Sequence, residues 1–172
     1  CGWTQEQVRT WLIDSGRQWK LERGQMSEEE CRRSLEADSG CDIDPDRLKH
    51  AAADIFRLND SIVPVVRQLK ESGIRLVLLS NTSVTHLNFI RSRWDILEYM
   101  DAHIASCDVG ALKPEAAIYE AALKVSGCDP EECFYTDDIP AYIEKAREFG
   151  IHAHVYRDTP GLVEALRSVG VG

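Results

Sequence analysis

Residues 134–150 read FYTDDIPAYIEKAREFG, a short apolar segment that runs into two adjacent aspartates and then into a helix. We predict a strand over Cys133–Thr136 and a helix over Pro140–Phe149, because proline suits the first helical turn and Gly150 ends the pattern. Asp137 and Asp138 then stand at the carboxyl end of a strand. In open parallel sheets, ligands bind at that edge.

The same alternation of strand and helix extends outward from this segment. Ile74–Leu79 is apolar apart from Arg75, which is typical of a strand covered on both faces. The element order predicts an α/β fold with a Rossmann-like, doubly wound parallel sheet. The other expected elements are strands over Ala102–Ser106 and Ile151–Tyr156, and helices over Ser61–Ser72, Val84–Arg91, Pro114–Ser126 and from Pro160 onward.

The first sixty residues predict helices only. Thr4-x-x-Gln7 and Ser27-x-x-Glu30 are capping-box patterns, in which each side chain satisfies a backbone amide of the first turn. Asp44-Pro45 is a third helix start, since proline fits the first helical position.

Composition narrows the function classes. The 172 residues carry 29 acidic and 20 basic side chains, a net charge of −9 that argues against nucleic acid as a partner. No apolar run reaches membrane-spanning length, so we expect no membrane partner.

The six cysteines form no CxxC pair, which favours free thiols in a reducing, cytoplasmic environment. The chain begins with Cys1 rather than methionine, which indicates processing, trimming or a fragment boundary.

Polar residues follow three of the predicted strands. Ser80-Asn81-Thr82 follows the first, a turn containing Lys113 follows the second, and Asp137-Asp138 follows the third. A hydroxyl, turn amides and a lysine suit a phosphoryl group, whereas paired carboxylates suit a hard cation such as Mg²⁺. Together they predict phosphoryl transfer.

Each of these features has a plainer alternative. Ser80-Asn81-Thr82 could cap the next helix, and Lys113 could be a solvated loop lysine. Asp137-Asp138 could stabilise the start of the helix that Pro140 opens. The three features in this order, at successive strand ends, favour a site over three separate coincidences.

Three segments together resemble the haloacid dehalogenase (HAD) superfamily. LVLLSNTS (Leu76–Ser83), GALKPEAAIY (Gly110–Tyr119) and FYTDDIPAYIEKAREFG (Phe134–Gly150) are similar to its second, third and fourth motifs. The phosphatase-type branch fits best, including sugar-phosphate phosphatases and the N-terminal phosphatase domain of soluble epoxide hydrolases. LERGQMSEEE (Leu21–Glu30) resembles that branch's helical cap. The resemblance implies a cap over residues 1–60 and an α/β core over residues 61–172.

The resemblance also implies roles for individual residues. Ser80 and the amide of Asn81 would bind phosphoryl oxygens, and Lys113 would neutralise the phosphate and the attacking carboxylate. Asp137 would bind Mg²⁺ directly, with Asp138 contributing directly or through water. Tyr142 stands where family members often carry asparagine, a departure expected to affect only loop packing or access.

The first family motif, a hydrophobic strand followed by DxDx[TV], has no counterpart in the sequence. Asp42-Ile43-Asp44 follows a polar segment and precedes Pro45, so we interpret it as a helix cap. Asp14 lies in a helical pattern. Because the resemblance places this motif between the strands at Ile74–Leu79 and Cys133–Thr136, we expect an incomplete sheet. The nucleophile is then expected upstream of Cys1, in a longer protein of which this chain is an inactive, truncated part.

The residues and the resemblance together predict a Mg²⁺-dependent phosphatase of a small phosphorylated metabolite, and the resemblance implies that it acts through an aspartyl-phosphate. A metal-free haloacid dehalogenase is an alternative, although adjacent carboxylates without a cation would repel each other. A non-catalytic binding or regulatory protein of the same fold is a second alternative.

Overall fold

A computed structural model of the chain describes residues 2–171. Cys1, for which the sequence indicates processing, trimming or a fragment boundary, lies outside these residues. The chain divides into two compact units that interleave in sequence. Unit 1 comprises Cys1–Arg57, Asn81–Trp94 and Ala105–Leu112. Unit 2 comprises Leu58–Ser80, Asp95–Ile104 and Lys113–Gly172. The predicted division into a cap over residues 1–60 and a core over residues 61–172 stays a prediction.

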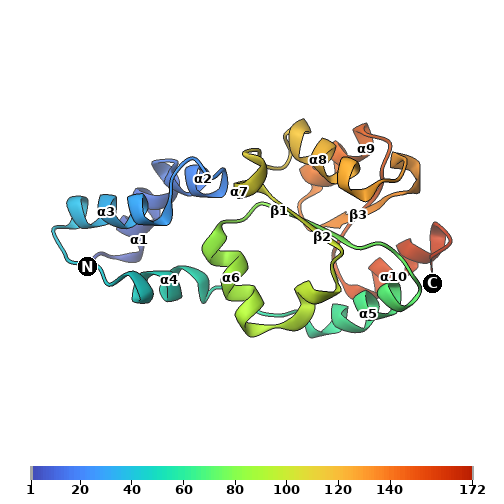
Figure 1. Cartoon of the computed structure of the whole chain (residues 1–172), viewed down its shortest axis with the longest axis horizontal. Helices are drawn as coiled ribbons and strands as arrows, with labels where there is room; N and C mark the ends of the chain where they lie inside the picture. The colour runs from blue at the N-terminus through green and yellow to red at the C-terminus, as the bar shows by residue number, and fades with distance from the viewer. Residues whose placement is uncertain (1, 172) are drawn as a thin grey trace. The chain divides into compact units, whose positions relative to one another are not determined.

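Unit 1 is built of helices, and its capping patterns are confirmed. Thr4 and Ser27 both form full capping boxes, and the Asp44 side chain accepts a hydrogen bond from the Arg47 amide at 2.7 Å. Figure 1 shows these helices from blue to green, with α7 in yellow. They are α1 (Gln5–Arg9), a π-helical turn (Thr10–Asp14), α2 (Arg17–Glu22), α3 (Glu28–Ser39), α4 (Pro45–Ala53), α6 (Val84–Arg93) and α7 (Ser106–Val109).

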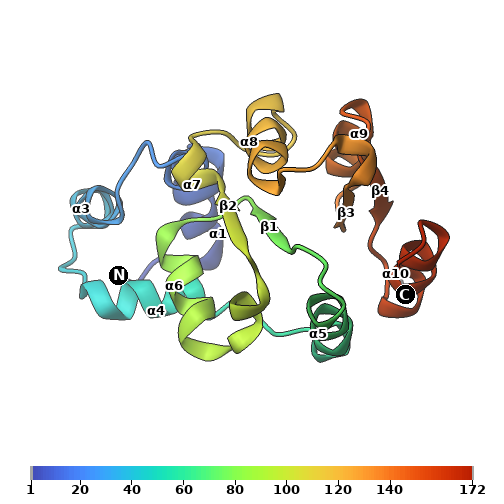
Figure 2. The same ribbon diagram turned by 45° about the vertical axis from the view of Figure 1, so that its right-hand side comes forward.

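Unit 2 carries the strands, with β2 ending at its boundary with unit 1. Two pairs form separate two-stranded sheets, β1 (Val77–Ser80) with β2 (Ala102–Ala105) and β3 (Phe134–Asp137) with β4 (His152–Val155). Figure 2 shows both pairs. The β3–β4 pair is parallel and aligns Asp137 with Val155. The helices of this unit are α5 (Val63–Glu71), α8 (Ala116–Ser126), α9 (Pro140–Glu148) and α10 (Thr159–Ser168), with 3₁₀ turns at Asp60–Ile62, Asp95–Tyr99 and Pro130–Glu132.

The core of unit 2 lies between α8 and α9. Ile118, Tyr119 and Ile143 are fully buried, and the Tyr119 ring stacks on Phe149 with centroids 5.7 Å apart. The Tyr119 hydroxyl donates to the carbonyl of Tyr142 at 2.9 Å, so its only polar atom is satisfied. This packing fixes α9, and with it the loop that follows Asp137.

The first strand begins later than its apolar pattern predicts. Ile74 is 39% exposed, and its amide donates to the Leu69 carbonyl to complete the end of α5. Asp101 binds both backbone groups of Leu76, its carboxylate accepting from the amide at 2.9 Å and its own amide donating to the carbonyl at 2.7 Å. Hydrophobicity alone does not reveal such competing backbone partners, so Val77–Ser80 is the strand rather than Ile74–Leu79.

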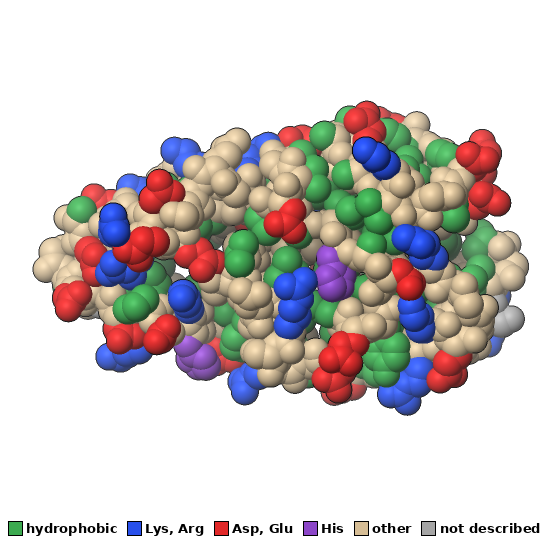
Figure 3. All heavy atoms as spheres, in the orientation of Figure 1, with side chains coloured by type: hydrophobic (Ala, Val, Ile, Leu, Met, Phe, Trp, Pro, Cys, Tyr) green, Lys and Arg blue, Asp and Glu red, His purple; other side chains and the backbone are tan. Residues whose placement is uncertain are grey.

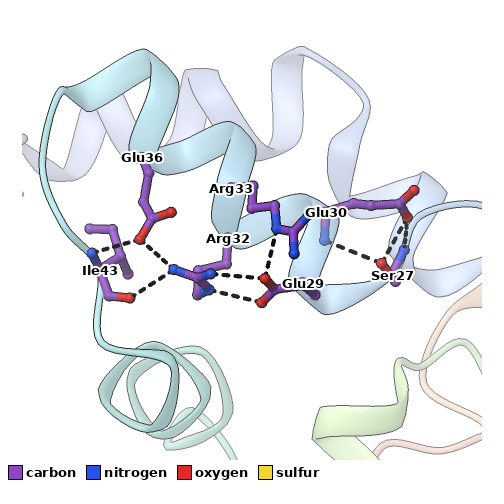
Figure 4. A network of polar contacts seen from close by, with 7 residues as sticks. All are labelled: Ser27, Glu29, Glu30, Arg32, Arg33, Glu36 and Ile43. Atoms are coloured by element: carbon purple, nitrogen blue, oxygen red, sulfur yellow. Dashed lines mark hydrogen bonds and ion pairs between the residues drawn. The ribbon is translucent and has the colours of Figure 1, made fainter.

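A polar network holds α3 to the segment that follows it (Figure 4). Arg32 binds both oxygens of Glu29 at 2.8 and 2.9 Å, pairs with Glu36, and donates to the Ile43 carbonyl at 3.3 Å. Glu36 also accepts from the Ile43 amide at 3.0 Å. Hydrogen bonds from Arg32 and Arg33 lower the pKa of Glu29 from 4.5 to about 2.

Figure 3 shows acidic and basic side chains interspersed over the viewed face.

Within the part of the chain that the structure describes, no helix is both long enough and apolar enough to cross a bilayer.

The lowered pKa of Glu29 predicts acid sensitivity. Ionised Glu29 favours the folded state above pH 4.5, and this contribution is lost as the pH falls towards 2, because protonation breaks both arginine contacts. Glu29→Gln should lower the Tm at pH 7 and flatten its decline between pH 4.5 and 2, as measured by circular dichroism. Glu164→Gln, an exposed change on α10, serves as the control. Identical pH profiles for Glu29→Gln and wild type would contradict this role.

Candidate phosphate and metal site

Lys113 is a buried cation at the junction of two strand ends. It is 8% exposed, although it lies in the loop before α8. Its Nζ donates to Asp137 Oδ2 at 2.6 Å, to the Leu79 carbonyl at 3.1 Å and to the Tyr135 hydroxyl at 3.3 Å. These acceptors match the three N–H groups of an ammonium. The solvated-loop alternative for Lys113 is therefore wrong, and we call Lys113, Asp137, Tyr135 and the Leu79 carbonyl the lysine cluster.

Asp137 is the anion of this cluster, with a side chain only 10% exposed. Besides Lys113, its Oδ2 accepts from the Tyr135 hydroxyl at 2.7 Å, and its Oδ1 accepts from the Ile139 amide at 2.9 Å. Burial raises the pKa of Asp137, but the hydrogen bonds from Lys113 and Ile139 outweigh it and hold the pKa below its usual value. Asp137 thus supports the start of α9, as the plainer alternative proposes, and also pairs with the buried lysine.

Ser80 is the last residue of β1 and lies half-buried next to Leu79, whose carbonyl binds Lys113. Asn81 is half-buried and belongs to unit 1. The side chain that caps α6 is Ser83, whose hydroxyl accepts from the His86 amide at 3.3 Å. The structure therefore assigns the cap to Ser83 and not to Ser80, Asn81 or Thr82.

Ser106 anchors the loop after β1. Its hydroxyl is completely buried, accepts from the Thr82 amide at 2.9 Å and donates to the Thr82 carbonyl at 3.2 Å. Both backbone groups of Thr82 are thus fixed by one side chain. From the sequence, Ser106 is expected only as the last residue of a strand, with no role in the site. Its position at the end of a strand, like that of Ser80, was the available signal.

Two tyrosines around Lys113 were also missed or underrated. Tyr135 lies two residues before Asp137 on β3, so both side chains fall on one face, and burial raises the pKa of its phenol. Tyr142 was expected to affect only packing or access. Its ring in fact faces the ammonium of Lys113, with Nζ 4.9 Å from the ring centroid.

The carboxylates of Asp137 and Asp138 are the type of ligand that Mg²⁺ prefers, but they are only two. Asp138 is exposed and directly follows Asp137. Mg²⁺ is often held by one or two carboxylates together with waters and substrate phosphate, and this donor set fits that pattern. Each carboxylate oxygen has two lone pairs, so Asp137 Oδ1 keeps one beyond its bond with Ile139. Among residues 2–171, no group of three or more His, Cys, Asp or Glu side chains is arranged to hold a metal ion.

The three aspartates considered as nucleophiles lie in unit 1, on a helical turn or in the segment before α4. Asp44 is the N-cap of α4, as predicted, and Asp14 is an exposed residue at the end of the π-helical turn. Asp42 precedes that cap and follows the turn after α3.

Comparison with known proteins identifies the family. A family model described as haloacid dehalogenase-like hydrolase matches residues 3–150. The flavin mononucleotide hydrolase 1 of Arabidopsis thaliana is 24% identical over 152 residues, which cover 88% of this chain and 61% of that protein. The bifunctional epoxide hydrolase 2 of Rattus norvegicus is 24% identical over 155 residues, covering 84% of this chain and 27% of that protein. The chain therefore spans less than two thirds of the length of either relative.

A solved structure confirms the predicted α/β fold. It is a HAD family enzyme of Bacteroides thetaiotaomicron, an aspartate-to-alanine mutant in complex with magnesium and inorganic phosphate. It superposes with a TM-score of 0.79 at 21% identity, covering 91% of this chain and 86% of that one.

Because Lys113 and Asp137 form a buried ion pair, we expect substitutions of the two residues to have non-additive effects on the free energy of unfolding. Lys113→Met should destabilise the protein by about 3–5 kcal/mol, because it leaves Asp137 buried without its cation. Asp137→Leu combined with Lys113→Met should cost clearly less than the sum of the single changes. Urea unfolding of the four proteins measures this coupling, and additive losses would show that the contact contributes little.

Because the Ser106 hydroxyl fixes the backbone of Thr82, we expect its removal to destabilise the loop after β1. Ser106→Ala should cost about 1–3 kcal/mol, because it leaves the buried Thr82 amide without an acceptor. Hydrogen exchange at the Thr82 amide should accelerate in this variant. Ser168→Ala, which removes an exposed hydroxyl bonded to the Ala165 carbonyl, is the matched control. Unchanged exchange at Thr82 would rule the anchor out.

Proposed function

This chain belongs to the family of haloacid dehalogenase-like hydrolases, and from that premise we propose that it is part of a Mg²⁺-dependent phosphatase of small phosphorylated metabolites. The observation that carries the proposal is the buried Lys113–Asp137 pair at the ends of β1 and β3. A lysine held in a nearly dry position at the carboxyl edge of strands is a strong point charge for a phosphoryl oxygen.

Three residues would hold the phosphoryl group. The Ser80 hydroxyl and the Asn81 amide follow β1 and would donate to its oxygens. Lys113 would neutralise charge on the phosphate and on the attacking carboxylate, which lowers the barrier most in a site shielded from water. Ser106 would act indirectly, since it fixes the backbone of Thr82 next to these donors.

Asp137 and Asp138 would hold the Mg²⁺. When bound, the ion would supply Lewis-acid polarisation of a phosphoryl oxygen. The magnesium and phosphate in the related Bacteroides enzyme support this cofactor. The lowered pKa of Asp137 keeps it in the ionised form that a metal ligand requires.

We place the nucleophile, an aspartate, on a segment outside residues 1–172. Its carboxylate oxygen would attack phosphorus while the bond to the substrate oxygen breaks, and water would then hydrolyse the aspartyl-phosphate to inorganic phosphate. Asp14, Asp42 and Asp44 belong to the helices and turns of unit 1, which supports this placement. The chain 1–172 alone should therefore be inactive.

The partner would be a small phosphorylated metabolite rather than a nucleic acid or a membrane, consistent with the net charge of −9. Cys31, Cys107, Cys128 and Cys133 are free thiols, which supports the reducing cytoplasm as its location.

The test is hydrolysis of p-nitrophenyl phosphate with and without Mg²⁺. The chain 1–172 should show no turnover, and a longer form preceded by a buried strand ending in DxDx[TV] should show Mg²⁺-dependent turnover. In that form, Lys113→Met should lower kcat/KM by about a hundredfold or more, because the charge on the transferred group loses its cation. Lys124→Met, an exposed lysine change on α8, should leave kcat/KM unchanged.

Two outcomes would contradict the proposal. Turnover by the chain 1–172 that is abolished by Asp137→Ala would place the nucleophile within this chain and reopen Asp14 and Asp42. Metal-independent release of halide from a 2-haloacid by the longer form, without phosphate release, would favour the dehalogenase alternative.

A further inference from the structure

A concave site lies in unit 1, where the segment after α4 passes the carboxyl end of α6. Figures 1 and 2 show α4 and α6 side by side. The cavity has a volume of about 460 Å³, within the range of small-molecule sites. Its lining consists of three aromatic and three charged residues, namely Phe56, Phe89, Trp94, Asp54, Arg57 and Arg93.

The aromatic rings of the lining are half-buried, and each contacts another ring. Phe89 and Trp94 meet edge to face with centroids 6.3 Å apart, and Phe56 meets His86 in the same way at 5.0 Å. Such contacts favour particular ring orientations, and the rings form the apolar part of the wall. Walls of this kind favour a flat ring that can stack on them or meet their edges.

The charges at this cavity are unbalanced. Asp54 Oδ1 lies 3.5 Å from Arg57 Nη1 and 3.9 Å from Arg93 Nη2, so one carboxylate is shared by two guanidinium groups. The Arg93 guanidinium also lies over the Phe89 ring, 5.4 Å from its centroid. The lining therefore carries one net positive charge, on a chain whose net charge is −9. Arg57 and Arg93 side chains are 75% and 54% exposed, so their remaining donors can reach a ligand.

We propose that this cavity binds a planar aromatic anion, with the ring against Phe56, Phe89 and Trp94 and the anionic group on Arg57 and Arg93. Arginine suits this task because its planar fork pairs with an oxyanion while its face stacks on an aromatic ring. The inference goes beyond the proposed phosphatase function, because the lining includes none of Ser80, Lys113 and Asp137.

Naphthalene-1-sulfonate is a suitable probe, since it joins a flat ring to an anion and contains no phosphoryl group to hydrolyse. Calorimetry with the full chain should detect saturable binding, and the indole N–H signal of Trp94 should shift in NMR spectra. The neutral analogue naphthalene-1-methanol should bind at least about tenfold more weakly, and methanesulfonate should not bind, if both ring and charge contribute.

Arg93→Gln and Arg57→Gln should each weaken sulfonate binding about tenfold, as expected for the loss of one charge-assisted contact. Both side chains are exposed, so the fold should tolerate the changes. Arg91→Gln, two residues before Arg93 on the same helix and outside the lining, should change the affinity less than twofold.

The inference would be overturned by equal affinity for the sulfonate and the neutral alcohol, or by equal effects of Arg91→Gln and Arg93→Gln. It would also be overturned if the sulfonate leaves the Trp94 signal unmoved while an acidic, aromatic peptide shifts it, which would assign the surface to a protein partner.

Discussion

The second unit depends on one buried positive charge. Between β1 and β3 the structure shows no hydrogen-bonded strand pairing, yet the Lys113 ammonium bonds to the Leu79 carbonyl of β1 and to Asp137 and Tyr135 of β3. A buried ammonium is costly unless it is paired and fully hydrogen-bonded. The need to satisfy it fixes the strand ends, the Tyr135 hydroxyl and the start of α9 in one arrangement.

That arrangement also explains why the proposed chemistry needs a divalent cation. Lys113 and Asp137 neutralise each other, and Asp138 adds one negative charge. Together with the attacking carboxylate, a phosphate dianion entering beside these groups would bring the local charge to about −4, which is unfavourable where water is excluded. A bound Mg²⁺ would reduce it to about −2 and would draw on the carboxylates for its ligands. In the proposed site, the lysine alone would therefore not suffice to bind phosphate, and the paired aspartates would be required with it.

The sequence predicts local structure well wherever a single side chain determines it. Thr4, Ser27 and Asp44 cap the helices they were expected to cap, and the order of strands and helices after residue 60 is the predicted one apart from the short, unpredicted α7. Prediction from the sequence fails where groups distant in the sequence bind the backbone of a predicted element. Asp101 takes the backbone of Leu76 and delays β1, and no spacing rule links residues 25 apart. The partners of Lys113 are equally non-local, so the residue could be named from its position but its burial could not. Ser106 and Tyr142 were missed or underrated for the same reason.

The two groups of cations in this chain differ in how they are neutralised, and this difference separates their functions. Lys113 is buried against its own carboxylate, so an anion that approaches it must compete with Asp137 or arrive with a metal ion. Arg57 and Arg93 are exposed and share one carboxylate at 3.5 and 3.9 Å, distances at which little energy is lost when an anion replaces that contact. A metal-free anion should therefore prefer the arginine cavity, whereas a phosphate ester with Mg²⁺ should prefer the lysine cluster. The two proposed anion sites can coexist in one chain because the Lys113 ammonium is buried in an ion pair, whereas the Arg57 and Arg93 guanidinium groups are exposed beside aromatic rings.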